Sequence, residues 1–161
     1  LIGCNVNYPP LETVAEVDVE RYMGTWYEVA RLPNSFENNC FCVQAVYTLR
    51  EDGTIRVRNL CRKDSLTGKE DLIEGKAFVV EGSNNAKLKV QFFWPFRGDY
   101  WVLWLADDYS VAVVGVPSRK YLWILSRTPD INEDLYRHLL KFASKSKFDI
   151  SNIIRVPQCS K

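Results

Sequence analysis

Few residues of this chain carry side chains that could perform a reaction. The chain holds five cysteines and a single histidine, His138. The thiols of Cys40-Phe41-Cys42 could act in redox chemistry if their pKa were lowered. We find no phosphate-binding loop, no G-x-S-x-G motif and no spaced cluster of metal ligands. The sequence therefore favours structural disulfides over a redox site, and it predicts no catalytic residue, no metal and no cofactor.

The cysteines stand at positions 4, 40, 42, 61 and 159, and none of them forms a Cys-x-x-Cys pair. His138 is far from all of them in sequence, so a zinc site is not expected. Paired disulfides would indicate an oxidising compartment. A cysteine at position 159 is well placed to fix a C-terminal tail that would otherwise fray.

Leu1-Ile2-Gly3-Cys4 has the form of the box at which bacterial lipoproteins are cleaved and their cysteine is acylated. A lipid on Cys4 would tether the protein to a membrane. Because Leu1 to Gly3 are present, we expect that this chain was not processed there. A free or partnered cysteine in an N-terminal arm is the alternative, and the box leaves both open.

A tryptophan and an arginine mark the two ends of a run of short apolar strands. Trp26 follows Gly24 in the first strand, and Arg127 ends the last one. Their side chains can meet only if the strands between them close on themselves. The guanidinium would then lie over the indole in a cation–π contact worth roughly 0.5–2 kcal/mol. This pair predicts a barrel that is plugged at one end and open at the other.

The strands between this pair alternate apolar and polar residues and are separated by turn signals such as Gly53 in Glu51-Asp52-Gly53-Thr54. Consecutive short strands with tight turns predict an all-β fold, an eight-stranded antiparallel up-and-down barrel. We expect the strands at about 25–31, 41–50, 55–61, 72–80, 87–94, 100–106, 109–115 and 121–127.

The other segments complete a single domain over residues 1–161. An N-terminal arm, 1–20, runs into a helical turn near residue 20 and then the barrel, 25–127. The apolar period then changes to 3.6 and predicts a helix over 130–146, with Asp130 and Glu133 at capping-box spacing. Its apolar stripe should pack on the barrel wall. An extended strap, 150–161, ends the chain.

The composition excludes several classes of protein. The chain is 47% hydrophobic and 13% aromatic, which is enough apolar mass for one core. Its net charge of +1 and the lack of a Lys/Arg run argue against nucleic acid as a partner. No apolar stretch approaches the roughly 18 residues that span a bilayer as a helix.

The chain resembles the lipocalin family over nearly its whole length, from about Val19 to Cys159. Gly24-x-Trp26, the Asp108-Tyr109 turn and Arg127 match the three signature regions of that family in order and spacing. The subgroup of bacterial outer-membrane lipocalins and apolipoprotein D is most similar. That similarity is carried by Arg21-Tyr22-Met23-Gly24-Thr25-Trp26-Tyr27-Glu28, Phe93-Trp94-Pro95-Phe96 and Trp123-Ile124-Leu125-Ser126-Arg127-Thr128-Pro129.

The resemblance implies a lipocalin calyx with one C-terminal helix on its wall, and a cavity for fatty acids, lysophospholipids, steroids or tetrapyrroles. It also implies a disulfide between Cys42 and Cys159, which leaves Cys40 and Cys61 as a second pair. An exchange of roles between Cys40 and Cys42 stays open. Cys4 matches another bridged cysteine of the subgroup. The region that would hold its partner reads Val113-Val114-Gly115 here and contains no cysteine, so we do not expect that bridge.

Strand alternation selects the side chains that face the barrel interior. The set is mostly apolar with a few polar groups, as is typical of a small-molecule pocket. The alternative is that these side chains simply fill the barrel, since eight strands enclose little more than that. On the first strand the alternation also places Ala30 inside. The expected ligand-binding residues are Glu28, Ala45, Tyr47, Val57, Asn59, Ile73, Ala77, Val90, Phe92, Tyr100, Val102, Trp104, Tyr121 and Trp123.

Glu28 would place a carboxylate inside this apolar interior. Burial of an unpaired charge is costly, so we expect the carboxyl group to be hydrated, protonated or partnered by Tyr47, Asn59 or Tyr121. A bulge that turns Glu28 out to solvent is the alternative.

The loops at the open end would be 32–39, 62–71, 95–99 and 116–120. Basic residues in them, including Arg97 and Arg119, would suit an amphiphile with its tail in the barrel and an anionic head at the rim. Phe36, Trp94 and Phe96 would lie nearby. Ordinary solvated loops are the alternative.

The sequence thus predicts an extracytoplasmic protein, secreted or an outer-membrane lipoprotein, that carries a small hydrophobic ligand. The prediction includes association with a membrane through Cys4 or through the open-end loops. We expect the protein to be a monomer or a weak dimer. Two rivals stay open. A lipid isomerase or epoxide-acting enzyme would lose turnover on mutation of Glu28, Tyr47 or a cysteine. A loop-mediated interaction protein would be favoured by a cavity too small for a ligand.

Overall fold

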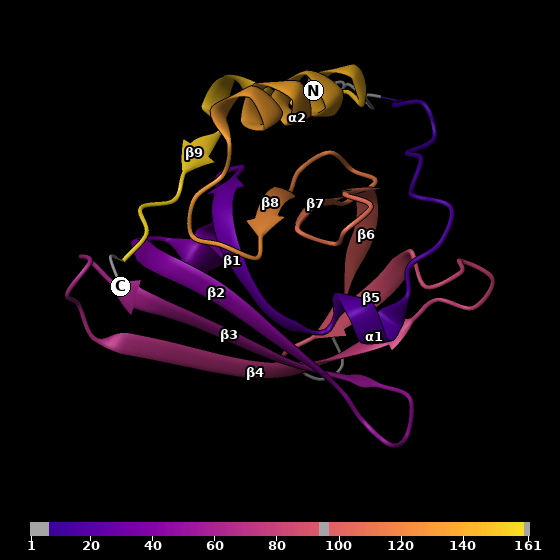
Figure 1. Cartoon of the computed structure of the whole chain (residues 1–161), viewed down its shortest axis with the longest axis horizontal. Coiled ribbons are helices and arrows are strands. Elements are labelled where there is room, and N and C mark those ends of the chain that lie inside the picture. Colours follow the sequence, from indigo (N-terminus) through magenta and orange to yellow (C-terminus); the bar gives the residue numbers. More distant parts are fainter. Residues whose placement is uncertain (1–6, 94–96, 160–161) are drawn as a thin grey trace, which may run out of the picture.

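The protein forms a closed antiparallel barrel, seen in a computed structural model that describes residues 7–93 and 97–159 (Figure 1). Each strand pairs with the next along the chain, and β1 pairs with both β8 and β2, which closes the sheet. The predicted up-and-down barrel is therefore confirmed. Its strands are β1 (Gly24–Arg31), β2 (Cys40–Leu49), β3 (Ile55–Lys63), β4 (Glu70–Val79), β5 (Lys87–Gln91), β6 (Gly98–Leu105), β7 (Val111–Gly115) and β8 (Leu122–Ser126).

Short helical elements connect and flank the barrel. One helical turn, α1 (Val19–Tyr22), precedes β1, and a 3-10 turn, η1 (Ser35–Glu37), lies in the loop between β1 and β2. After the barrel come α2 (Glu133–Lys145), a second 3-10 turn, η2 (Ile150–Asn152), and a two-residue strand, β9 (Ile154–Arg155). None of the helices within the described residues is long and apolar enough to cross a membrane.

The predicted capping box of the helix is wrong. Asn132, not Asp130, caps the N-terminus of α2, because its side-chain oxygen accepts a hydrogen bond from the backbone N–H of Leu135 at 3.0 Å. The helix therefore begins at Glu133. Most strand ends differ from the expected ones by one to three residues. For example, β5 stops at Gln91, and β7 starts only at Val111, after a turn in which Tyr109 adopts a positive φ of 59°.

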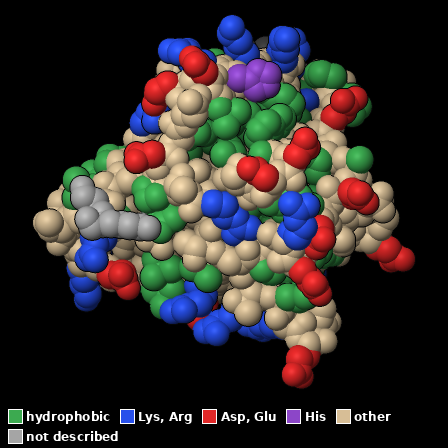
Figure 2. All heavy atoms as spheres, in the orientation of Figure 1, with side chains coloured by type: hydrophobic (Ala, Val, Ile, Leu, Met, Phe, Trp, Pro, Cys, Tyr) green, Lys and Arg blue, Asp and Glu red, His purple; other side chains and the backbone are tan. Residues whose placement is uncertain are grey.

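Helix α2 lies across the outside of the barrel, at the top of Figure 1. Leu139 and Ala143 on its inner face are fully buried against Leu122 and Ile124 of β8. An apolar helix face of this kind is stabilised by the surface that it removes from water. The space-filling view shows Lys and Arg side chains along the outer side of this helix, with charges of both signs scattered over the barrel (Figure 2).

The closed end of the barrel is sealed by Trp26 and Arg127. The indole is fully buried, and its N–H donates to the carbonyl of Tyr22 at 2.8 Å. The guanidinium carbon of Arg127 lies 3.8 Å from the centroid of the indole ring. The guanidinium also donates to three backbone carbonyls, those of Thr25 at 3.0 Å, Arg21 at 2.8 Å and Tyr109 at 3.2 Å.

The rest of the signature residues support this seal. Gly24 has a φ of +96°, and a Cβ there would lie 3.3 Å from a guanidinium nitrogen of Arg127, so glycine suits both the backbone and the space. The Tyr109 hydroxyl accepts from the backbone N–H of Asp18 at 2.9 Å. Asp108 accepts from the N–H of Ser110 and holds the turn that presents Tyr109.

The C-terminal strap fills a gap between β1 and β2. The pairing of β1 with β2 is limited to Gly24–Tyr27, and β9 pairs instead with Ala30 and Arg31 near the open end. Just beyond β9, the backbone N–H of Cys42 donates to the carbonyl of Pro157 at 2.8 Å. The strap therefore completes the wall where the two strands diverge.

Two disulfides are present in the described part of the chain. Cys42 is bonded to Cys159, across a sequence separation of 117 residues, and Cys40 is bonded to Cys61. These are the two pairs that the family resemblance implies. Cys40 and Cys42 thus have different partners and do not form a disulfide with each other. Cys4 lies outside the described residues.

Replacing Arg127 by alanine tests the seal. Loss of charged hydrogen bonds and of the cation–π contact should lower the free energy of unfolding by about 2–4 kcal/mol. Urea denaturation measures this difference. Arg137→Ala, in an exposed ion pair on α2, is the matched control and should cost under about 1 kcal/mol. Equal losses in the two variants would contradict the importance of the seal.

Candidate functional site

The barrel interior is the candidate site, and strand register defines the residues that line it. Trp26 pairs with Ala45, Ala45 with Asn59, and Asn59 with Ile73. Directly paired residues point to the same side of a sheet, so this row faces inward with the buried Trp26. The row therefore identifies the inward face of the neighbouring strands β1, β2, β3 and β4.

Exposure along the inward faces changes from the closed end to the open end. Tyr47, Val57 and Ala77 are buried, whereas Ala45 and Asn59 are partly exposed and Ile73 is 37% exposed. All of these side chains face the same interior by their register. Solvent therefore reaches the inside of the barrel from the open end only part of the way down.

Most of the expected ligand-binding residues come together in the interior. They belong to, or pack against, one cluster that includes Trp26 and Leu125. Asn59, Ile73, Glu28 and Tyr121 lie outside that cluster, and their roles in ligand binding remain predictions, as do those of the members. The members that the sequence predicted are Ala45, Tyr47, Val57, Ala77, Val90, Phe92, Tyr100, Val102 and Trp123.

Two side chains differ from the alternation. Trp104 packs against the cluster under α2, on the outer side of the wall, because the register of β6 shifts between Val102 and Trp104. Ala30 is buried in that same outer cluster, because β1 has a corresponding shift between Glu28 and Ala30. In both strands a bulge breaks the period of two, which a simple alternation cannot anticipate.

The floor of the interior carries three tyrosines, Tyr22, Tyr47 and Tyr100. The hydroxyl of Tyr100 lies 2.8 Å from that of Tyr22 and 2.9 Å from that of Tyr47. A hollow of about 20 Å³ remains beside them, which is enough for roughly one water-sized group. The other residues that line it are Met23, Ile55, Val57, Ala77, Leu88 and Val90.

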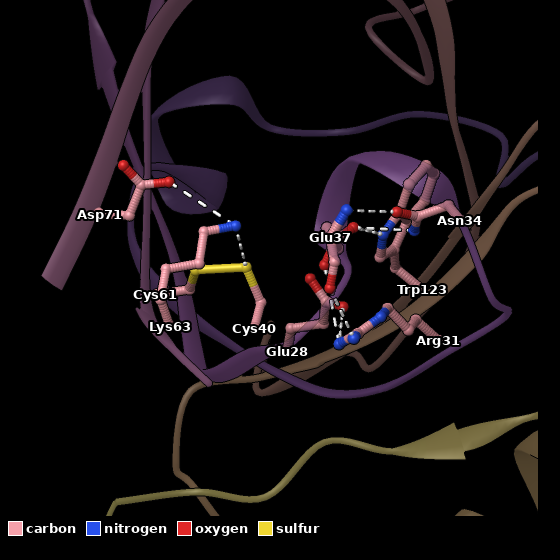
Figure 3. Close-up of a disulfide and its surroundings, with 9 residues drawn as sticks. All are labelled: Glu28, Arg31, Asn34, Glu37, Cys40, Cys61, Lys63, Asp71 and Trp123. Carbon is pink, nitrogen blue, oxygen red and sulfur yellow. Dashed lines mark hydrogen bonds and ion pairs between the residues drawn. A yellow bond between two sulfur atoms is a disulfide. The ribbon is translucent and has the colours of Figure 1, made fainter. Parts of the chain in front are cut away.

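Near the open end, one arginine lies between two carboxylates (Figure 3). Arg31 donates to Glu28 Oε1 at 3.4 Å and to the backbone carbonyl of Glu37 at 3.0 Å, and it lies 3.8 Å from Glu37 Oε2. Glu37 Oε1 accepts hydrogen bonds from Trp123 Nε1 at 2.8 Å and from Asn34 at 3.0 Å. These contacts attach the η1 turn to strands β1 and β8.

The Glu28 carboxyl group is buried, and its pKa is raised well above the usual value. Burial is the largest cause, the charge of Glu37 and a hydrogen bond with Glu37 add to it, and Arg31 opposes it. One guanidinium cannot fully neutralise both the buried carboxylate of Glu28 and the half-buried carboxylate of Glu37. Glu28 therefore retains its proton to higher pH than an exposed glutamate does.

Sequence reasoning missed the partners of Glu28. We expected Tyr47, Asn59 or Tyr121, or a bulge that exposes Glu28, but the bulge follows Glu28 and turns the next residues instead. It places Arg31, which pairs with Trp123, on the inner face. The available signal was Arg31 itself, a charged residue at the end of an apolar strand that could pair with Glu28. Strict alternation, however, places the side chain of Arg31 on the outer face.

Aromatic side chains stand at the open end. Phe36 of η1 is 59% exposed, and its ring centroid lies 5.5 Å from that of Tyr121 and 6.4 Å from that of Trp123. Phe36 therefore lies beside the entrance from the interior to solvent. Trp94 and Phe96, which the sequence placed near this rim, lie outside the described residues.

The expectation that Arg119 is a free rim cation is wrong. Arg119 is only 6% exposed, and its guanidinium donates to the carbonyls of Pro9, Pro117 and Ser146. It joins the N-terminal arm to the end of α2. Arg97 is exposed, and its guanidinium carbon lies 4.0 Å from the centroid of the Phe78 ring. Among the described residues, no group of three or more His, Cys, Asp or Glu side chains is arranged to hold a metal ion.

Replacing Glu28 by glutamine tests the raised pKa. The folded protein keeps a proton that the unfolded chain releases near pH 4.5, so the unfolding free energy should fall as pH rises above that value. The fall should reach up to about 1.4 kcal/mol per pH unit until Glu28 ionises in the folded state. Glu28→Gln should remove this component of the slope, as measured by urea denaturation from pH 4 to pH 8.

Glu81→Gln, in an exposed turn, is the control for losing one carboxylate elsewhere. Parallel pH profiles for the wild-type protein and Glu28→Gln would show that Glu28 titrates alike in the folded and unfolded chains. That outcome would contradict the retained proton.

Comparisons with known proteins agree with this geometry. Residues 17–158 match the family model described as a Lipocalin-like domain. The chain is 44% identical over 157 residues to temperature-induced lipocalin-1 of Arabidopsis thaliana, covering 92% of this chain and 83% of the relative. It is 41% identical over 160 residues to the outer membrane lipoprotein Blc of Escherichia coli K12, covering 98% and 90% respectively.

More distant matches extend the likeness. Apolipoprotein D of Macaca fascicularis is 32% identical over 154 residues, covering 90% of this chain and 78% of the relative. Insecticyanin from Manduca sexta, a solved structure with 22% identity, superposes with a TM-score of 0.75 over 96% of this chain and 90% of its own. The sealed barrel, its signature residues and these matches show that the chain belongs to the lipocalin family.

Proposed function

We propose that this lipocalin binds a small hydrophobic or amphiphilic ligand in its barrel and transports or stores it. The observation that carries the proposal is the change in exposure along the inward faces, from buried Tyr47 and Val57 to the exposed Ile73. An apolar interior that opens to solvent at one end favours ligands that water holds poorly.

The ligand would lie between the tyrosines of the floor and the aromatic side chains of the open end. Phe92, Tyr121 and Trp123 would contact its body, and Tyr47 and Tyr100 its inner end. The names of two relatives, an outer membrane lipoprotein and an apolipoprotein, favour a lipid. A fatty acid or lysophospholipid is thus the first choice, and a sterol-like molecule or tetrapyrrole is the alternative.

An extracytoplasmic location accompanies this function. Two disulfides, Cys40–Cys61 and Cys42–Cys159, suit an oxidising compartment. The name of the outer membrane lipoprotein Blc points the same way. Lipid attachment at Cys4 belongs to this proposal, and mass spectrometry of protein isolated from its own source would detect the added mass.

The small volume of the floor hollow, about 20 Å³, favours a second candidate function. A barrel filled by its own side chains would leave the loops as the functional surface, as in a protein-interaction module. For a carrier, the same volume requires side chains near Phe36 and Trp123 to move when a ligand enters. An enzyme acting on lipids would instead show turnover that depends on Glu28 or Tyr47.

Filling the interior separates a carrier from an interaction module. Ala45→Phe places a ring above the floor tyrosines, whereas Val46→Phe places the same ring on the outer face of the same strand. Ala45→Phe should weaken binding of palmitic acid and palmitoyl-lysophosphatidylcholine at least about tenfold, because each methylene kept out of the barrel loses roughly 0.8 kcal/mol. Quenching of tryptophan emission measures the affinity.

Val46→Phe should bind these ligands as the wild-type protein does, and circular dichroism checks that both variants fold. If neither lipid, nor a sterol, nor a bilin alters the emission of the wild-type protein, the interaction module becomes the better account. If a bound lipid is recovered chemically changed, the enzyme becomes the better account.

A further inference from the structure

The outer side of helix α2 and the residues just after it are basic. From Leu135 to Phe148 the chain has four Lys or Arg residues and no Asp or Glu. Three of them, Arg137, Lys141 and Lys145, are spaced by four residues, so they follow one another along one side of the helix. Lys147 comes directly after the helix, and all four are exposed. Figure 2 shows Lys and Arg side chains gathered over this helix.

The acidic residues of α2 are confined to its first turn, at the other end of the helix. Glu133 and Asp134 stand there, and they form the ion pairs of this helix in the described part of the chain, with Arg155 and Arg137. The lysines of the later turns take no part in these ion pairs. Positive charge that is not offset by a paired carboxylate therefore accumulates toward the C-terminal end of α2.

The C-terminal end of α2 lies beside the open end of the barrel. Arg119, in the turn between β7 and β8, donates to the carbonyl of Ser146 at 2.9 Å. The next residue, Lys120, is exposed, and its Nζ lies 5.4 Å from the centroid of the Tyr121 ring. The Tyr121 ring contacts that of Phe36, beside the entrance. The contacts of Arg119 and Lys120 therefore connect the end of α2 to the aromatic side chains at the entrance.

The described part of the N-terminal arm is attached at the same place. The Arg119 guanidinium also donates to the carbonyl of Pro9 at 2.6 Å. At no more than about 3.6 Å per residue, Cys4 is within about 18 Å of Pro9 whatever path the chain takes. A lipid on Cys4, as proposed above, would therefore hold a membrane close to the end of α2.

We propose that Lys120, Lys141, Lys145 and Lys147, together called the lysine face, form a docking surface for a membrane that contains anionic phospholipids. The negative surface potential of such a membrane attracts each lysine that comes within a Debye length of it. Docking needs no ligand in the barrel, so this inference goes beyond the proposed function.

The exposed ring of Phe36 favours a membrane over an acidic protein as the partner. Its apolar body can enter the boundary between head groups and acyl chains, while the lysines stay among the phosphates. Docked in this way, the protein would hold the open end of its barrel against the membrane. A lipid ligand would then pass between the membrane and the barrel without crossing water.

Binding to vesicles in the absence of any ligand tests the lysine face. The full chain carries Cys4→Ser, so that neither a lipid nor an intermolecular disulfide contributes. Vesicles are made of phosphatidylcholine alone, or of an equal mixture of phosphatidylcholine and phosphatidylglycerol. At low salt the protein should bind the anionic vesicles at least about tenfold more tightly than the neutral ones, and added salt should release it. Co-sedimentation measures the bound fraction.

Two triple variants of equal net charge show where on the protein the vesicles bind. The face variant removes three charges from the lysine face, through Lys141→Gln, Lys145→Gln and Lys147→Gln. The control variant removes three charges from the outer faces of β3 and β4, on the wall remote from α2 (Figure 1), through Arg56→Gln, Arg58→Gln and Lys76→Gln. Glutamine and lysine have similar helix propensities, and circular dichroism checks that both variants fold.

The face variant should bind the anionic vesicles at least about tenfold more weakly, because each lysine near such a surface contributes about fivefold in affinity. The control variant should keep most of its binding. Equal losses in the two variants would show that net charge alone drives the binding, and would overturn the inference.

Two further outcomes would also overturn it. One is equal binding of the parent protein to neutral and anionic vesicles. The other is failure to bind either kind of vesicle, and if the parent protein then binds polyglutamate, an acidic protein is the better partner for this face. Because no ligand is present in this assay, a failure here leaves the proposed ligand binding to its own test.

Discussion

The contact between Trp26 and Arg127 is the constraint on which the rest of this structure depends. The two residues are brought together only when β1 and the end of β8 meet, so the contact exists only in a closed barrel. It also joins the α1 turn and the β6–β7 turn to the floor through carbonyls of Arg21 and Tyr109. The Trp26 ring and the Arg127 guanidinium close one end of the barrel, so the interior opens to solvent at the other end.

The first strand serves several neighbours in its eight residues, and its bulge makes this possible. Near the closed end it pairs with β2, and toward the open end it pairs with β8 and with β9 of the strap. The register shift after Glu28 turns Ala30 outward under α2 and Arg31 inward beside Glu28. The contact with the helix and the placement of Arg31 beside Glu28 thus both follow from this one bulge.

The interior differs in character between its two ends. At the floor, three tyrosine hydroxyl groups bond to one another among aliphatic side chains, whereas the region near the open end holds Arg31 with two carboxylates. Such an order suits a molecule with an apolar inner end and a more polar outer end. The η1 turn, held to Trp123 through Glu37, places Phe36 beside the entrance between these regions and water.

The sequence by itself determined the elements and the closure. Turn residues such as Gly53, the period of two and the pair Trp26 and Arg127 act locally or at fixed positions, so an antiparallel barrel with a C-terminal helix followed from them. Tertiary structure decided where the period breaks. Bulges in β1 and β6 depend on what packs outside the wall, so the inward turn of Arg31 and the outward turn of Trp104 could not be read from alternation. The meeting of Tyr22, Tyr47 and Tyr100 was also decided there, because residues that are distant in the chain share a hydrogen bond only after the barrel closes.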